Sequence, residues 1–159
     1  MSSDSVKPEF YDKRPSPLSE WYRRMLHGKE FTICDFDWFI QKRFQKSPNN
    51  LIIIEEKTVK SFDNPLCITL GEAYLFNNLL SIIKEDITLP IYIVFIEGTD
   101  FHSIYKGVFF CKYKTNYLVD CNKIKIKGFY NLDLTPKCKK LSEEELILKI
   151  INSDTKMEV

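Results

Sequence analysis

The sequence predicts an α/β domain in which a mixed central sheet is flanked by helices. Residues 51–59, LIIIEEKTV, begin with four consecutive aliphatic residues, which is typical of a strand covered on both faces. Thr69 and Glu72 have the spacing of a helical capping box, and Pro90 precedes a second apolar run at 91–98. Strand, helix and strand in this order indicate a layered α/β architecture.

Further elements are expected before this unit. Ser16 followed by Pro17 favours a helix start, and we expect a helix over residues 16–26. Aromatic and β-branched residues predict a strand over 31–43, and the polar residues at 46–50 predict a turn after it. The strand at 51–59 would then pair with 31–43 as a hairpin.

The second half of the chain predicts one more helix inside the domain and an antiparallel C-terminal extension. After Thr69, apolar residues at helical spacing extend the helix to about Glu85. Shorter strands are expected at 107–113, 116–121 and 123–129, with a turn near 114–116. Ser142 and Glu145 form another capping box, which predicts a closing helix through the run LILKII.

Length and composition indicate a single domain. The 159 residues, 44% of them hydrophobic, suffice for one buried core, and we place that domain at 16–152, with a flexible arm at 1–15 and a frayed tail at 153–159. The 23 basic and 22 acidic residues give a net charge of +1. Because the net charge is close to zero, no overall electrostatic field attracts nucleic acid. A nucleic-acid function therefore has to depend on a local basic patch or on a specific site.

No membrane-spanning run or apolar signal core is present, so the sequence predicts a soluble cytoplasmic protein without a membrane partner. The five cysteines lack a Cys-x-x-Cys spacing, which favours buried free thiols over zinc ligands or a disulfide framework. One alternative is a bond between Cys111 and Cys121 across a hairpin.

The change from four aliphatic residues to Glu55-Glu56-Lys57 within one predicted strand is the clearest sign of chemistry. Alternation puts Glu55 and Lys57 on one face and the Glu56 side chain on the other. A carboxylate can hold a divalent cation, and a neighbouring lysine can orient water and offset charge on a phosphate. The alternative without a catalytic role is an ordinary surface ion pair at a strand end.

A metal site needs a second carboxylate, and Asp37 on the preceding strand can supply it. Asp35 lies on the same face and is a rival ligand. We favour Asp37 because it directly precedes the apolar run Trp-Phe-Ile. Mg²⁺ prefers such oxygen ligands and keeps water in its remaining positions.

The segments DFDWFI and LIIIEEK together resemble the D…(D/E)-x-K signature of the restriction-endonuclease-like superfamily, the PD-(D/E)XK nucleases. The expected order of helix, strand, strand, helix and strand over 16–97 also matches the core of that family. The resemblance implies a metal-dependent endonuclease or exonuclease that hydrolyses phosphodiester bonds of DNA, with Mg²⁺ as the cofactor and Mn²⁺ as a substitute.

Transferred residue by residue, the resemblance makes Asp37 and Glu55 metal ligands and Lys57 the catalytic lysine. The peptide carbonyl of Glu56 would be a further ligand, and Glu20 on the first helix would be a further catalytic carboxylate. The sequence departs from the family at two places.

The first departure is Phe36, which replaces the proline before the first acidic residue. The second is the helix after the lysine, where relatives often carry Gln and Tyr and this chain has Glu72 and Tyr74. The capping box accounts for Glu72 without any catalytic role.

Three rival functions remain open at this point. The chain could be a catalytically inactive nuclease-like fold that binds nucleic acid or protein, an RNA endonuclease with the same site, or an unrelated small α/β binding protein. The lysines within 122–128 and 137–140 either contact phosphates or are simply solvated. Cleavage of a duplex requires two cuts, which is compatible with a homodimer.

Overall fold

The computed structural model describes residues 37–41, 51–83 and 89–152, and four isolated helical positions at 17, 21, 24 and 25. The chain divides into two compact units, 1–35 and 36–159, and both sheets lie in the second. The expected arm at 1–15, most of the helix at 16–26, the turn at 46–50 and the tail at 153–159 lie outside the described residues. The single domain at 16–152 stays a prediction.

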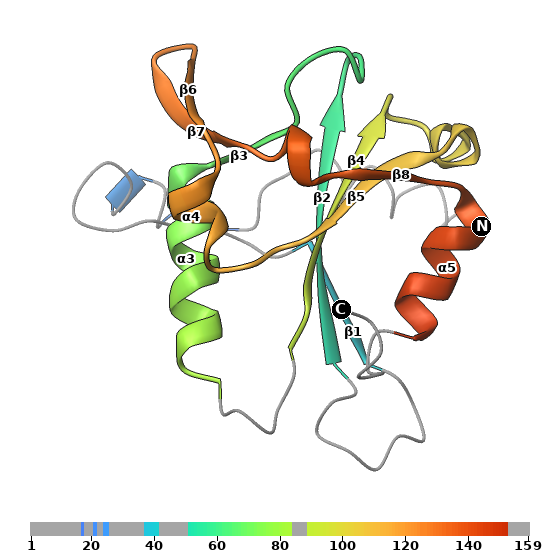
Figure 1. Cartoon of the computed structure of the whole chain (residues 1–159), viewed down its shortest axis with the longest axis horizontal. Coiled ribbons are helices and arrows are strands. Elements are labelled where there is room, and N and C mark those ends of the chain that lie inside the picture. The colour runs from blue at the N-terminus through green and yellow to red at the C-terminus, as the bar shows by residue number, and fades with distance from the viewer. Residues whose placement is uncertain are drawn as a thin grey trace. The chain divides into compact units, whose positions relative to one another are not determined.

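A five-stranded sheet forms the centre of the described part (Figure 1). Its strands, in spatial order, are β1 (Trp38–Gln41), β2 (Leu51–Val59), β4 (Ile91–Glu97), β5 (Val108–Lys112) and β8 (Lys139–Leu141). β2 and β4 are parallel, whereas the other three neighbouring pairs are antiparallel. The predicted mixed sheet is therefore confirmed.

The helix α3 (Leu70–Ser81) connects the parallel strands β2 and β4, as the sequence predicts. Its capping box is present: the Thr69 hydroxyl accepts a hydrogen bond from the Glu72 N–H at 3.1 Å, and the Glu72 carboxylate accepts one from the Thr69 N–H at 3.0 Å. The helix ends at Ser81 rather than near Glu85. The Ser81 hydroxyl donates to the Asn78 carbonyl at 2.7 Å, a local bond that competes with helix continuation.

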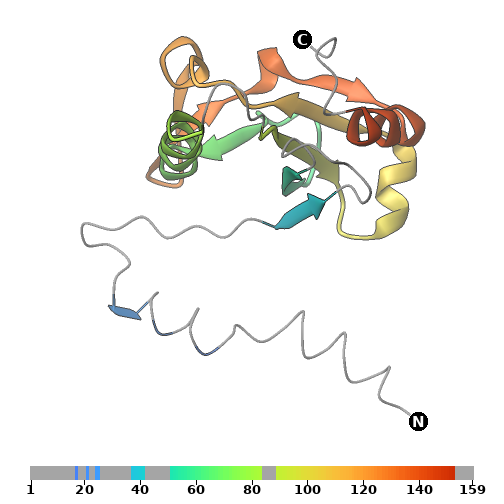
Figure 2. The same ribbon diagram turned by 90° about the horizontal axis from the view of Figure 1, so that it is seen from below.

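Helices cover both faces of the sheet, and Figures 1 and 2 show α3 and α5 (Glu143–Ile151) on opposite sides of the central strands. On the α3 side, Phe76 packs with Ile53 and Ile93. On the α5 side, a second cluster includes Ile52 and Tyr92, together with partly buried helix residues. β2 is thus buried from both sides in its first half, which explains its uninterrupted aliphatic run.

Two short 3₁₀ helices accompany these elements, η1 (Phe101–Lys106) after β4 and η2 (Thr135–Lys137) before β8. The sequence does not predict these two helices or β8. A three-residue strand leaves almost no hydrophobic period to detect.

A second, three-stranded antiparallel sheet contains β3 (Cys67–Thr69), β7 (Phe129–Asp133) and β6 (Lys123–Ile126), in that order. The prediction of one strand over 123–129 is wrong, because this segment turns back on itself. Lys127 and Gly128 have φ values of 50° and 86°, as the two central residues of a tight hairpin turn require.

The strand predicted at 116–121 is also wrong, because the segment forms the helix α4 (Tyr117–Asp120). Tyr117 and Cys121 are both buried, and their spacing of four residues puts them on one side of a helical turn. The short apolar run at 117–119 that suggested a strand fits a single helical turn as well.

The four described cysteines, Cys67, Cys111, Cys121 and Cys138, are free, as the sequence predicts. Cys111 and Cys121 are also buried as predicted, whereas Cys67 and Cys138 are partly exposed. The alternative bond between Cys111 and Cys121 is absent, since the hairpin that would carry it does not form. A hydrogen bond with Cys138, followed by burial, raises the pKa of the Cys111 thiol.

None of the helices in the described ranges is long and apolar enough to cross a lipid bilayer.

Candidate active site

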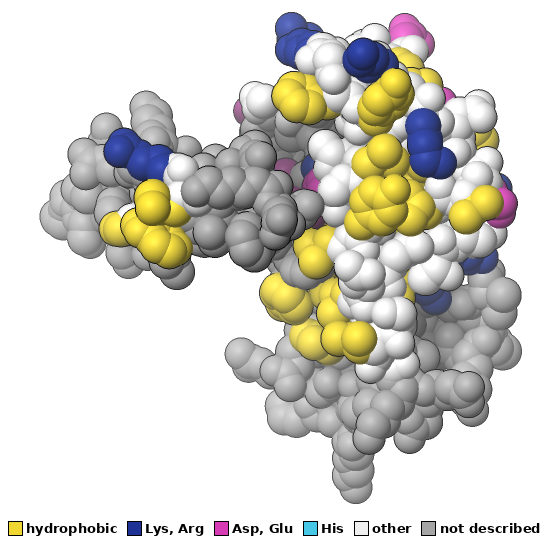
Figure 3. Space-filling model, turned by 90° about the vertical axis from the view of Figure 1, so that its left-hand side faces the viewer, with side chains coloured by type: hydrophobic (Ala, Val, Ile, Leu, Met, Phe, Trp, Pro, Cys, Tyr) yellow, Lys and Arg dark blue, Asp and Glu magenta, His cyan; other side chains and the backbone are white. Residues whose placement is uncertain are grey.

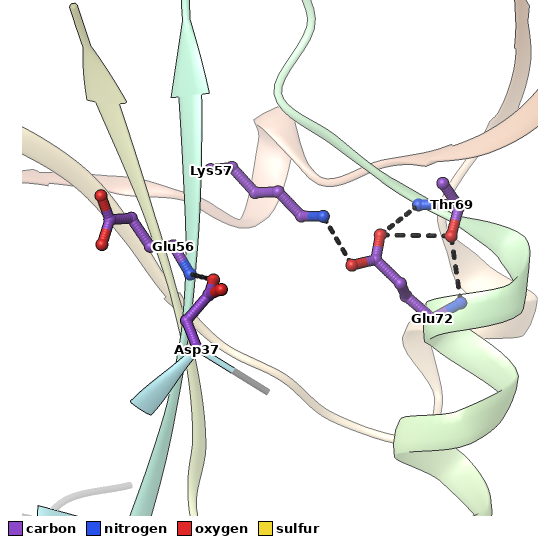
Figure 4. A network of polar contacts seen from close by, with 5 residues as sticks. All are labelled: Asp37, Glu56, Lys57, Thr69 and Glu72. Atoms are coloured by element: carbon purple, nitrogen blue, oxygen red, sulfur yellow. Dashed lines mark hydrogen bonds and ion pairs between the residues drawn. The ribbon is translucent and has the colours of Figure 1, made fainter. Parts of the chain in front are cut away.

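The pairing of β1 with β2 brings Asp37 to the charged half of β2. Trp38 lies opposite Ile54 in the antiparallel register, so the next step along the ladder leads to Asp37 and Glu55. The Asp37 carboxylate accepts a hydrogen bond from the backbone N–H of Glu56 at 2.8 Å (Figure 4). The hairpin pairing on which the assignment of Asp37 depended is therefore present.

Glu55 is a buried carboxyl group, 4% exposed, on the side of β2 that faces α3. Burial, then a hydrogen bond with the Asp37 side chain and the charge of Asp37, raise the pKa of Glu55 to about 9, although Lys57 opposes the shift. Near neutral pH, Glu55 therefore keeps a proton and is hydrogen-bonded to Asp37. The two carboxyl groups form one coupled unit.

Lys57 extends from the same side of β2 and reaches the start of α3. Its ammonium group forms an ion pair with a Glu72 carboxylate oxygen at 2.5 Å (Figure 4). The other oxygen of Glu72 accepts hydrogen bonds from the backbone N–H and the hydroxyl of Thr69, at 3.0 and 3.1 Å. One carboxylate thus caps the helix and also holds the lysine.

The side chain of Glu56 lies on the opposite side of β2 from Lys57, as strand alternation predicts (Figure 4). Its carboxylate accepts a hydrogen bond from the indole N–H of Trp38 at 3.2 Å. Glu56 contributes to the site through its backbone N–H, which holds Asp37. Its side chain links β1 to β2 on the far face.

The structure brings together three of the residues predicted from sequence: Asp37, Glu55 and Lys57. Glu20 and the rival ligand Asp35 lie outside the described residues. The capping box accounts for Glu72 in the sequence, which does not predict its bond with Lys57. No local signal indicates this bond, because the loop at 60–66 and the strand β3 lie between Lys57 and the helix.

Within the described ranges, no three Asp, Glu, His or Cys side chains form a group that could hold a metal ion. The donor set that the resemblance implies is smaller, two carboxylates and the Glu56 carbonyl. Asp37 and Glu55 fit this set chemically, because both supply the hard oxygen atoms that Mg²⁺ prefers. A cation would also stabilise the ionised form of Glu55, which burial and then its contacts with Asp37 now disfavour.

No family model, curated protein or solved structure matches the chain. The interpretation of the site therefore depends on its own geometry and electrostatics.

The coupled carboxyl pair predicts how stability depends on pH without divalent ions. Glu55 ionises with an ordinary pKa in the unfolded chain but stays protonated in the fold up to about pH 9. Its contribution to the free energy of unfolding is therefore present at low pH and decreases above the unfolded pKa, by at most about 1.4 kcal/mol per pH unit.

Glu55→Gln removes this decrease, because the amide can still donate a hydrogen bond to Asp37 without ionising. We expect urea denaturation in EDTA to show the variant and the wild type equally stable near pH 4, and the variant increasingly more stable toward about pH 8. Curves that run parallel over this range would show that Glu55 ionises normally in the folded protein.

Proposed function

We propose that the protein is a metal-dependent nuclease that hydrolyses phosphodiester bonds of DNA, with Asp37, Glu55 and Lys57 in its active site. The observation that carries the proposal is the meeting of two carboxyl groups from neighbouring strands with an ammonium group from one of them. They meet toward the carboxyl end of a strand in a parallel pair, where open α/β sheets bind ligands.

The strand order supports the assignment to a restriction-endonuclease-like core. An antiparallel pair, β1 and β2, is followed by α3 and by β4 parallel to β2. This is the strand, strand, helix and strand succession that the resemblance implies. We infer the family from this succession together with the D…(D/E)-x-K residues.

Asp37, Glu55 and the Glu56 carbonyl are the groups that would hold Mg²⁺ or Mn²⁺. Such an ion, when bound, supplies Lewis acidity and lowers the pKa of a coordinated water. The remaining functions belong to the chain itself: Asp37 is fixed by the Glu56 N–H, and Glu55 is shielded from water by its burial.

As water attacks a phosphodiester, negative charge builds up on the phosphate oxygens. The Lys57 ammonium group supplies the positive charge that stabilises it. Glu72 holds Lys57 through their ion pair, and its charge adds to the rise in the pKa of Glu55, so we regard it as a positioning residue. Its capping bonds with Thr69 fix the carboxylate before substrate binds, which lowers the entropic cost of placing the lysine.

The β6–β7 hairpin adjoins this site and suits a nucleic-acid substrate. Thr69, which holds Glu72, pairs with Asn131 of β7. Toward the turn, Phe129 is 74% exposed, and the Lys125 ammonium group lies 5.7 Å from the ring centroid of Tyr130. Figure 3, which views the molecule from the left-hand side of Figure 1, shows hydrophobic and basic side chains interspersed near the top. Exposed aromatic rings beside lysines can contact bases and phosphates.

DNA is favoured over RNA because the superfamily that the chain resembles acts mainly on DNA. An RNA endonuclease would use the same residues. Parallel assays on single-stranded DNA, duplex DNA and RNA oligonucleotides distinguish these substrates.

A second candidate function is a catalytically inactive nuclease-like fold that binds nucleic acid or protein. It is favoured by the ion pair that already occupies Lys57, and by the absence of a three-residue donor group among the described side chains. Under this alternative, Asp37 and Glu55 would be a structural carboxyl pair.

Replacing the lysine tests the proposal directly. We expect the wild type to cleave DNA with Mg²⁺ or Mn²⁺, and Lys57→Ala to lose about 100-fold or more of that activity, because the variant lacks the charge next to the phosphate. Lys60→Ala is the matched control, since Lys60 is an exposed lysine just after the same strand and should be dispensable.

Cleavage is measured on end-labelled oligonucleotides, with folding of each variant checked by circular dichroism. Equal rates for the two variants and the wild type would reject the catalytic role of Lys57. No cleavage by the wild type with any of these substrates and metals would instead support the inactive binding module.

Glu72→Gln tests the positioning role. Glutamine also completes a capping box, so stability should change little, whereas the ion pair with Lys57 is lost. We expect kcat to fall about 10-fold to 100-fold while KM stays near its wild-type value, because the lysine is misplaced and substrate contacts persist. A lower melting temperature with unchanged kcat would show that Glu72 serves only the helix.

A further inference from the structure

Away from the carboxyl pair, five lysines surround one pocket. It has a volume of about 160 Å³ and lies where β5, η2, β8, α4 and α5 come together. This volume is small beside that of sites for drug-sized ligands, which are about 300–1,000 Å³. The lysines are Lys112, Lys114, Lys137, Lys139 and Lys149.

The topology gathers these lysines from three separate parts of the chain. Lys112 lies opposite Tyr92 at the end of β5, and Lys139 lies opposite Phe110 in the pairing of β5 with β8. Lys114 follows β5 directly. Sequence spacing alone could not show this convergence, because it depends on β8, which the sequence did not predict.

Aromatic rings form part of the pocket wall. The Lys137 ammonium group lies 5.5 Å from the ring centroid of Tyr117, and the Lys149 ammonium group lies 6.0 Å from that of Phe110. Such contacts attract a cation without neutralising its charge. The Lys137 ammonium group therefore keeps its charge beside the Tyr117 ring and can attract an anion.

No Asp or Glu is among the described residues that line the pocket. Lys139 is within electrostatic range of Glu145, but that carboxylate accepts the Ser142 N–H at 3.0 Å as part of a capping box. Lys112, Lys114, Lys137 and Lys139 alone bring four like charges to one pocket, which is unfavourable unless an opposite charge enters. The pocket thus has a strong excess of positive charge in a protein whose net charge is only +1.

We propose that this pocket binds adjacent phosphate groups of one ligand. Lysine ammonium groups suit phosphate oxygens, which accept several charge-assisted hydrogen bonds at once. The same chemistry is offered by a free oligophosphate and by the backbone of a nucleic acid. The proposal is independent of the nuclease activity, because the pocket contains none of the residues of the candidate active site.

The test compares two double variants that remove the same charge. Lys114→Gln/Lys139→Gln changes two exposed lysines of the pocket, and Lys60→Gln/Lys106→Gln changes two exposed lysines outside it. Inorganic tripolyphosphate is titrated into each protein by calorimetry at about 0.15 M salt, where long-range attraction between exposed charges is screened. Binding to a short DNA oligonucleotide is measured in parallel in EDTA, so that no cleavage occurs.

We expect the pocket variant to bind tripolyphosphate about 10-fold more weakly than the wild type and the control variant to bind it unchanged. If the nucleic-acid backbone is the source of the phosphates, oligonucleotide affinity also falls selectively, and its salt dependence decreases by about two charges. The proposal is overturned if both double variants bind both ligands alike. Neither readout depends on catalysis, so failure here leaves the proposed nuclease untouched.

Discussion

The burial of Glu55 within a central strand is the constraint on which the site depends. The first half of β2 is covered on both faces by apolar side chains, so the strand cannot shift without exposing its core residues. This register places Glu55 inside the fold and Asp37 beside it. The apolar core therefore holds the two carboxyl groups side by side, with Glu55 protonated and hydrogen-bonded to Asp37.

The helix α3 couples the fold to the proposed chemistry. Its first turn needs hydrogen-bond acceptors, and Glu72 supplies one while its second oxygen holds Lys57. Folding of the helix and placement of the lysine therefore depend on the same side chain. In the sequence, the capping box is enough to explain Glu72. In the structure, the same side chain also holds Lys57.

The sequence predicted the elements with strong local signals. The uninterrupted aliphatic run of β2, the capping boxes at Thr69 and Ser142, and the shared face of Glu55 and Lys57 all appear in the structure. It failed where the signal was short or non-local. A single helical turn at 117–120 has the same apolar spacing as a short strand, and the lysine pocket depends on strand pairings between distant segments.

Titration calorimetry with Mn²⁺ shows directly whether Asp37 and Glu55 bind a divalent cation, as we propose. We expect the wild type to bind Mn²⁺ and to release a proton on binding, since Glu55 is protonated beforehand. Asp37→Asn and Glu55→Gln should each weaken binding by about 10-fold or more. Wild-type affinity in both variants, or no Mn²⁺ binding by the wild type, would contradict it.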